Sequence, residues 1–174
     1  MESTPELVVL LSEDGTPVGT ADKATVHTSD TPLHLAFSCH LYNDAGEVLV
    51  TRRALGKATW PGVWTNSFCG HPAPGEHPEE ALVRRARREL GATVADVEVV
   101  LPEFRYRAVD ASGIVENEVC PVYRARVVGA FEPAPDEIAE YAWVSPDALA
   151  DAVRATPFAF SPWLVLQLEQ LARA

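Results

Sequence analysis

Residues 70–91 read GHPAPGEHPEEALVRRARRELG, and this stretch decides the fold. It predicts a helix over residues 77–90, because Pro78 is tolerated in a first turn and because acidic residues precede arginines along the segment. Gly91 follows directly and is typical of a residue that ends a helix. The helix carries an apolar stripe, so one of its faces should pack against other elements of the same domain.

Glu89 is an unusual residue for its place in this helix. On a helical wheel it falls about 20° from Leu82, inside the apolar stripe. It also lies in the last turn, where the helix dipole disfavours an anion. Glu89 therefore needs a positive partner, which is either an i,i+4 ion pair with Arg85 or a bound metal ion.

Strand patterns flank this helix on both sides. They predict strands at residues 6–11, 34–43, 47–54, 97–108, 114–128 and 138–144. Two further helices are expected at 145–153 and 161–174, each opened by a Ser-Pro pair that suits a helix start. The chain has no repeats and no obvious linker. The pattern predicts a mixed α/β or α+β fold in a single domain over residues 1–174.

Composition restricts the class of partner. The chain has 174 residues, of which 47% are hydrophobic, so it can bury a sizeable core. Its formal net charge of −11 disfavours nucleic acid or an anionic membrane surface as a partner, because either would need a basic face. A small anion held by a few local cations is compatible with this charge.

The three cysteines give no sign of a disulfide framework or a cysteine-rich zinc motif. Cys39, Cys69 and Cys120 are an odd set without closely spaced pairs. The apolar run near the N-terminus, residues 7–11, is too short for a signal peptide or a membrane span. We therefore expect a protein of the reduced cytoplasm, in which a cysteine taken alone is more often a small buried hydrophobe than a nucleophile.

A pair of carboxylates is the first candidate for chemistry. In GIVENEVCPV (113–122), strand alternation puts Glu116 and Glu118 on one face, with Cα atoms about 6.5–7 Å apart. Two like charges on a half-apolar face repel each other. Either the face is solvated, or a cation neutralises the pair, or one carboxylate stays protonated as a catalytic acid.

Three histidines could complete a metal site with these carboxylates. His27 and His34 flank the polar stretch TSDTPL, and His71 follows a cysteine-containing loop. Imidazole together with carboxylate suits zinc or manganese, whereas a set of oxygens alone suits magnesium. The spacing by itself is a weak signal, because neither HExxH nor a repeated CxxC is present.

These segments resemble the Nudix superfamily, whose signature is G-x5-E-x7-R-E-U-x-E-E-x-G. The residues that match it are Gly70, Glu76, Arg84, Glu89 and Gly91. Arg85 and Arg88 stand where the signature has glutamates that help to hold magnesium in Nudix hydrolases. The resemblance therefore counts against diphosphate hydrolysis.

The departures from the signature point to one branch of the superfamily. The segments TNSFCGHP (65–72), FRYRA (104–108), GIVENEVCPV and SPW (161–163) resemble, in order, those of type I isopentenyl-diphosphate isomerases. This resemblance covers most of the chain. It implies a Nudix-like α/β/α sandwich with a mixed sheet, and the interconversion of isopentenyl and dimethylallyl diphosphates.

The resemblance also implies the residues of the site. A metal-binding set for Mn²⁺ or Zn²⁺ falls on His27, His34, His71, Glu116 and Glu118. A second site, for Mg²⁺ bridged to the substrate diphosphate, falls on Glu89 and the backbone oxygen of Cys69. The catalytic pair falls on Cys69 and Glu118, with Tyr106 near the carboxylate and Trp163 lining the pocket. Contacts to the diphosphate are expected from Lys23, Arg53, Lys57 and Arg85.

The implied reaction needs a dry pocket. Protonating an unactivated alkene gives a tertiary carbocation that water would quench, so an acid and a base must act where solvent is excluded. The loop WPGVWTNSFCGHP (60–72) would present Cys69 and His71 on one face, with Trp60 and Trp64 excluding water. The face of Trp163 could stabilise the cation. Cys39 and Cys120 are expected to be structural.

Two other functions fit parts of the pattern. One is a Nudix hydrolase of a nucleotide or prenyl diphosphate, which phosphate release would reveal. The other is a catalytically silent binding domain with a Nudix-like fold, which would not need Cys69, Tyr106 and Glu118 together. The sequence leaves open which of Cys69 and Glu118 donates the first proton, and whether the protein is a monomer or a homodimer.

Overall fold

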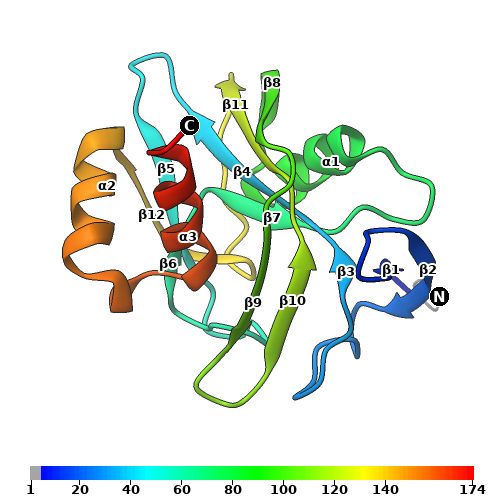
Figure 1. The fold of residues 1–174 in the computed structure, drawn as a ribbon. Helices are drawn as coiled ribbons and strands as arrows, with labels where there is room; N and C mark the ends of the chain where they lie inside the picture. Colours follow the sequence, from blue (N-terminus) through cyan, green and yellow to red (C-terminus); the bar gives the residue numbers. More distant parts are fainter. Residues whose placement is uncertain (1–4) are drawn as a thin grey trace.

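The computed structural model describes residues 5–174, which form two β-sheets with helices on both sides (Figure 1). The smaller sheet has the strand order β2 (Pro17–Asp22), β1 (Leu7–Leu11), β3 (His34–Leu35), β10 (Val115–Val119) and β9 (Arg105–Val109). The larger sheet has the order β12 (Ile138–Val144), β5 (Val48–Arg53), β4 (Phe37–Tyr42), β11 (Val122–Val128) and β8 (Thr93–Leu101). Two short strands, β6 (Trp64–Thr65) and β7 (Phe68–Gly70), pair with β5 and β4. The predicted mixed α+β fold is confirmed.

Two chain segments pass from one sheet into the other side by side. One runs through β3 and β4, the other through β10 and β11, and both strand pairings between them are parallel (Figure 1). The predictions of single strands at 34–43 and 114–128 are therefore wrong at one point each. The first breaks at Ala36, and the second breaks at Cys120 and Pro121, because proline has no N–H to give to a strand ladder.

Other strand boundaries also differ from the prediction. The strand expected at 97–108 is two strands, β8 and β9, which belong to different sheets and are separated by a turn at Pro102 and Glu103. The sequence pattern missed β2, which has no buried residue to give it an apolar face. It also missed β6 and β7, which are too short to show a period. These three strands are recognised only through their pairing, of β2 with its neighbour β1, of β6 with β5 and of β7 with β4.

The three α-helices of residues 5–174 lie where the sequence predicts them. They are α1 (Pro78–Leu90), α2 (Pro146–Ala155) and α3 (Pro162–Leu171), with a short 3₁₀ turn, η1 (Pro157–Ala159), before the last. Gly91 ends α1 in the left-handed conformation, with φ of 56°. Ser145 and Ser161 cap α2 and α3 by accepting backbone N–H groups. None of the helices in this range is long and apolar enough to cross a membrane.

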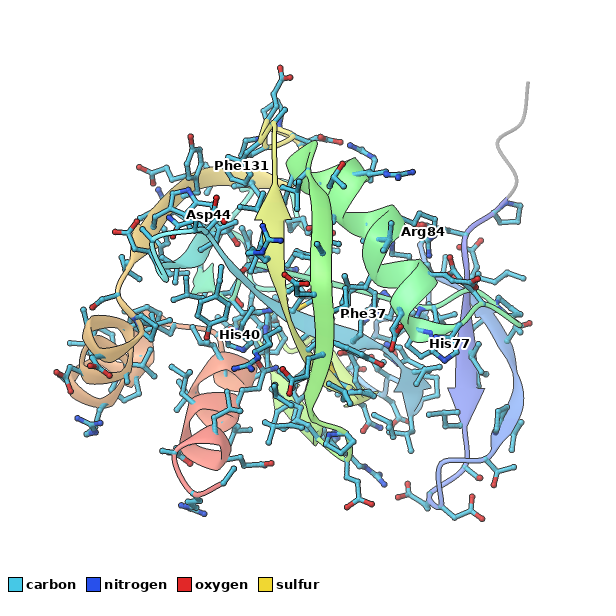
Figure 2. The ribbon with its side chains drawn as sticks, turned by 90° about the horizontal axis from the view of Figure 1, so that it is seen from above. Phe37, His40, Asp44, His77, Arg84 and Phe131 are labelled. Atoms are coloured by element: carbon cyan, nitrogen blue, oxygen red, sulfur yellow. The ribbon has the colours of Figure 1, made fainter. Side chains whose placement is uncertain are left out.

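The larger sheet lies between α1 on one face and α2 with α3 on the other (Figure 2). Strand alternation along β4 produces this arrangement. Phe37, Cys39 and Leu41 belong to a core cluster that includes residues of α1. Between them, the side chain of His40 hydrogen bonds Gln167 of α3, with 2.9 Å between Nε2 and Oε1. The α1 side of the sheet is therefore apolar, whereas the α3 side contains buried polar groups.

Candidate active site and metal centre

A cavity of about 290 Å³ lies where the two sheets meet. Every predicted site residue except His34 lines it, namely Lys23, His27, Arg53, Lys57, Cys69, His71, Arg85, Glu89, Tyr106, Glu116, Glu118 and Trp163. His34 is fully buried directly behind this wall. The residues come from both sheets, from α1 and from α3, so only the folded chain brings them together.

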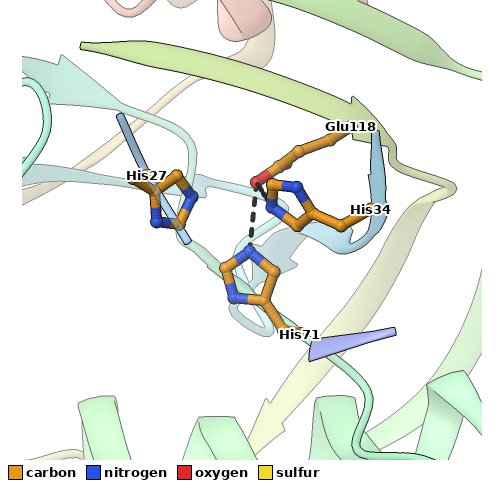
Figure 3. Close-up of side chains that lie close together, drawn as sticks. All are labelled: His27, His34, His71 and Glu118. Carbon is orange, nitrogen blue, oxygen red and sulfur yellow. Dashed lines mark hydrogen bonds and ion pairs between the residues drawn. The ribbon is translucent and has the colours of Figure 1, made fainter. Parts of the chain in front are cut away.

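Three histidines and one glutamate form a compact group at one end of the cavity (Figure 3). Their potential ligand atoms all lie within 4.8 Å of one another. Glu118 of β10 is in register with His34 of β3, while His27 follows β2 and His71 follows β7. We call these residues, together with Glu116, the histidine end of the cavity.

The histidine end has polar atoms that lack hydrogen-bond partners within residues 5–174. They are Nε2 of His27, Nε2 of His34, Nδ1 of His71 and Oε2 of Glu116, and of these the His27 and Glu116 atoms lie 3.1 Å apart without forming a hydrogen bond. His34 Nδ1 lies 2.9 Å from the carbonyl oxygen of Pro32. A carbonyl only accepts, so Nδ1 carries the hydrogen and Nε2 of the neutral ring points a lone pair at Glu118 Oε1, 3.4 Å away. Imidazole lone pairs and carboxylate oxygens that converge in this way fit a divalent cation.

Glu116 and Glu118 share one face, as strand alternation predicts, and both are buried, which excludes the solvated alternative. Burial by itself would raise the pKa of Glu118, but the imidazoles of His34 and His71 beside it hold it well below its usual range. The pKa of Glu116 is raised by burial and by the charge of Glu118. His71 stays neutral, because burial lowers its pKa to about 4. The two carboxylates therefore differ in their readiness to hold a proton.

Tyr106 and Glu118 form a direct hydrogen bond. They are register partners on β9 and β10, and Tyr106 Oη donates to Glu118 Oε2 over 3.0 Å. Burial and the nearby Glu118 raise the pKa of the phenol well above its usual value, so Tyr106 remains protonated. The phenol therefore serves as a hydrogen-bond donor to this carboxylate.

Cys69 is the only one of the three cysteines that lines the cavity. It lies on β7 opposite Ser38 of β4, and its thiol is 3.3 Å from the Ser38 hydroxyl. Burial raises the pKa of this thiol to about 11, although the hydrogen bond with Ser38 opposes the rise. Cys39 and Cys120 are fully buried in two apolar clusters, in agreement with a structural role.

Aromatic rings form one wall of the cavity. Trp163 packs against Tyr106 and against the edge of Trp60, with ring centroids 5.6 Å and 5.3 Å apart. The guanidinium of Arg53 lies 5.5 Å from the centroid of the Trp163 ring. Trp64 does not contribute to this wall, because it packs with residues of β5, α2 and α3 on the far side of the larger sheet. Of the two loop tryptophans, only Trp60 therefore supports the predicted dry wall.

Paired charges line another part of the cavity, which we call the arginine end. It comprises Lys57, Arg85, Glu89 and Glu137. Arg85 forms the predicted i,i+4 pair with Glu89 and lies 3.4 Å from Glu137, which also pairs with Lys57. Burial raises the pKa of Glu89, while the charge of Arg85 opposes the shift. The predicted ion pair of Glu89 is therefore present, and a metal ion at this carboxylate stays a prediction.

Close approach of α1 to β7 creates the arginine end. A Cβ atom on Gly70 would lie 2.7 Å from Cγ of Arg85 and 2.8 Å from the ring of Phe37, so only glycine fits at this position. Glu137, which the sequence analysis missed, reaches the cavity because β12 pairs with β5 in a register that puts Ile138 opposite Arg53. No local pattern around Glu137 indicates this position.

Comparison with known proteins assigns the fold first. A family model described as the NUDIX domain matches residues 32–164. A solved structure from Deinococcus radiodurans superposes with a TM-score of 0.72 at 21% identity, covering 95% of this chain and 99% of that one. A MutT protein structure from Methanosarcina mazei gives a TM-score of 0.61 at 20% identity, with 82% and 94% coverage. These likenesses define a protein of the Nudix fold.

Curated relatives are more specific than the fold. Proteins named isopentenyl-diphosphate Delta-isomerase from Paenarthrobacter aurescens and Clavibacter sepedonicus are 65% and 63% identical to this chain. The first alignment covers 97% of this chain and 92% of the relative, and the second covers 98% and 90%. The chain belongs to the isopentenyl-diphosphate Delta-isomerase family of the Nudix superfamily.

Proposed function

We propose that this protein interconverts isopentenyl diphosphate and dimethylallyl diphosphate, the activity for which its relatives are named. The observation that carries the proposal is the meeting of a thiol, a phenol and a carboxylate, those of Cys69, Tyr106 and Glu118, in one cavity with an aromatic wall. A thiol and a phenol–carboxylate pair can add a proton to one carbon and remove a proton from another. Hydrolysis would need neither a thiol nor a dry aromatic wall.

The signature helix gives a second argument against the hydrolase alternative. Of the three positions at which the Nudix signature has metal-binding glutamates, this chain keeps only Glu89. Arg85 turns into the cavity and pairs with that glutamate. Arg88 is exposed and pairs with Asp136, with 2.5 Å between Nη2 and Oδ2. A single carboxylate on α1 is a poor platform for a metal-activated water.

The reaction that we propose moves two protons and no other atoms. One of Cys69 and Glu118 adds a proton to the terminal CH₂ of the alkene, which leaves a tertiary cation on the branched carbon. The other removes a proton from the neighbouring CH₂, so the double bond moves by one position. Trp163 and Tyr106 lie against each other beside these groups, and their ring faces would stabilise the cation without capturing it.

Four cations that line the cavity, two of them at the arginine end, would hold the diphosphate. Lys23, Arg53, Lys57 and Arg85 all line the cavity. Lys57 and Arg85 are held by Glu137, and Arg53 donates to the backbone oxygen of Thr59, so the three side chains are oriented before a ligand arrives. Orientation before binding lowers the entropy cost of binding an anion.

Two divalent cations complete the proposal. His27, His34, His71, Glu116 and Glu118 would hold Mn²⁺ or Zn²⁺, and Glu89 with the backbone oxygen of Cys69 would hold Mg²⁺ together with the diphosphate. When bound, these ions neutralise the carboxylates and make protons on neighbouring groups more available. The unpartnered imidazole and carboxylate atoms support the first site, and the preference of magnesium for oxygen ligands supports the second.

Deuterium incorporation tests the proposal directly. The metal-loaded protein is given isopentenyl diphosphate in deuterated water, and we expect solvent deuterium in a methyl group of dimethylallyl diphosphate, because the added proton comes from an exchangeable acid. Cys69→Ala should lower this rate by about 10³-fold, whereas Cys39→Ala, in the core, should retain it. Release of phosphate or pyrophosphate without deuterium incorporation would establish the hydrolase instead.

A further inference from the structure

Asn66 is fully buried in the loop between β6 and β7, and its side chain contacts residues from two different parts of the cavity wall. Its Nδ2 donates to the backbone oxygens of Cys39 and Phe68, at 3.0 Å and 2.9 Å. Carbonyl oxygens only accept, so these contacts fix which end of the amide is nitrogen and which is oxygen. The Oδ1 atom must therefore face the cavity wall.

Three donors converge on Oδ1 of Asn66. Trp163 donates its indole N–H at 3.0 Å, Thr65 its hydroxyl at 2.9 Å and Cys69 its thiol at 3.4 Å. The indole N–H is a donor only, which confirms the orientation of the amide. One oxygen atom thus contacts the cavity thiol and the Trp163 ring of the aromatic wall.

The helix that carries Trp163 is attached at the same place. The Ser161 hydroxyl, which caps α3, lies 2.7 Å from the Thr65 hydroxyl, and the Ser161 backbone N–H donates to the Trp64 carbonyl at 2.8 Å. Within residues 5–174, the start of α3 is therefore tied to the segment 64–66 by a side-chain link, a backbone link and the indole hydrogen bond. The amide of Asn66 connects these contacts to Cys69, because its Oδ1 atom also accepts the thiol hydrogen.

We propose that Asn66 is a positioning residue that fixes the Cys69 thiol and the Trp163 ring relative to each other, an inference that rests on the proposed function. The reacting carbon must face the thiol while the developing cation faces the ring, so both must keep one spacing through the reaction. A misplacement of about 1 Å can cost about 10²-fold in rate. Asn66 sets this spacing without touching the substrate, because its polar atoms are all engaged by protein groups.

Asn66→Ala should therefore lower kcat about 10²-fold while KM changes by less than about threefold. Asn43→Ala is the matched control. Asn43 is a half-buried asparagine in the turn between β4 and β5, and its side chain binds only Ala45 and Glu47, away from the cavity. Asn43→Ala should keep kcat within about threefold. Equal losses in the two variants, or an unchanged kcat in Asn66→Ala, would overturn the inference.

Hydrogen exchange of the Trp163 indole N–H gives a readout that does not depend on activity. Its resonance, assigned by its loss in Trp163→Phe, should exchange slowly in the wild-type protein and at least about tenfold faster in Asn66→Ala. If Asn66→Ala does not fold, Asn66→Ser is measured in its place. The exchange rate of the indole N–H in the wild-type protein still tests the contact between Trp163 and Asn66. Exchange as fast as that of the half-buried Trp64 in the wild type would refute the contact.

The two hypotheses fail in different ways. A wild-type protein that forms no deuterated product refutes the proposed function. An active wild type whose Asn66→Ala variant is equally active refutes only the role of Asn66. In a Trp163→Phe background, the further loss from Asn66→Ala should be smaller than in the wild type, because one of the two groups that Asn66 positions is already changed. An equal loss in both backgrounds would contradict positioning through Trp163.

Discussion

At the histidine end of the cavity, four buried atoms of His27, His34, His71 and Glu116 have no hydrogen-bond partner within residues 5–174. At the arginine end, Arg85 faces two carboxylates, and Lys57 faces one of the same two. Each unpaired buried polar group costs about 1–3 kcal/mol. The histidine end therefore gains stability from an added cation, whereas the arginine end is already close to electrically neutral without a ligand.

This difference separates two ways of preparing a site. The histidine end keeps ligand atoms directed at one point, so the folded protein is less stable until a cation binds. The arginine end keeps its cations oriented by pairing them with carboxylates, so an incoming diphosphate must take over these partners. Substitutions at the first end should therefore affect chemistry and metal affinity, whereas those at the second should affect substrate binding and folding.

The largest effect is expected from Glu118→Gln. This change keeps the size of the side chain but removes the charge that faces His34, His71 and Tyr106, so kcat should fall by about 10³-fold or more. Glu137→Gln is the matched change at the arginine end and should keep kcat within about tenfold. Steady-state rates of both variants decide the point. Similar losses in kcat would remove the distinction between the two ends.

Metal removal should expose the same asymmetry without any substrate. Adding Zn²⁺ or Mn²⁺ to the chelated protein at about 1,000 times Kd should stabilise it by about 4 kcal/mol, seen as a rise in melting temperature. Glu89→Gln should respond like the wild type, because Glu89 lies at the arginine end. His71→Ala should respond far less. An equal response in these two variants would refute the metal site at the histidine end.

A third effect, on folding, belongs to the arginine end. Arg85→Met removes the cation and leaves Glu89 buried without an opposite charge, which should lower the free energy of unfolding by about 3 kcal/mol. Arg88→Met breaks the exposed pair with Asp136 on the same helix and should cost less than about 1 kcal/mol. Urea unfolding measures both. Comparable losses in the free energy of unfolding would mean that burial does not make the Arg85–Glu89 pair more stabilising than the exposed pair.

Local rules predicted the parts of the site that depend on one element. Strand alternation placed Glu116 and Glu118 on one face, and helix geometry identified Glu89 as a residue that needs a positive partner. These predictions hold because each uses only neighbours along the chain. Which partner Glu89 takes remained open, since the choice depends on how closely α1 approaches β7 at Gly70.

The other parts of the site depend on contacts between distant segments and could not be predicted from local pattern. Glu137 faces the cavity only because β12 pairs with β5, and Asn66 meets Trp163 only because α3 returns to the loop after β6. The run Thr65, Asn66, Ser67 did contain a signal. These three uncharged polar residues lie between Trp64 and Phe68, and polar side chains that are buried are normally hydrogen-bonded.

The smallest effect is expected from Glu76→Gln, which breaks an ion pair of the same chemistry just outside the arginine end. Glu76 accepts from Nε and Nη2 of Arg84, both at 2.8 Å, and from the backbone N–H of Ala73. The hydrogen bonds from Arg84 lower the pKa of Glu76 below its usual 4.5. A carboxyl group whose pKa is lowered by folding stabilises the protein above its unfolded pKa and loses that contribution as the pH falls through the folded value.

Glu76→Gln should therefore cost about 1 kcal/mol or less at pH 7, because Arg84 is partly exposed, and the difference from wild type should shrink as the pH falls below about 4.5. Urea unfolding at a series of pH values measures this difference. Arg85→Met provides the comparison at pH 7, where it should cost several times more although both changes remove one member of an Arg–Glu pair. A Glu76→Gln cost that equals that of Arg85→Met, or that grows in acid, would show that burial does not distinguish the arginine end from the exposed pair beside it.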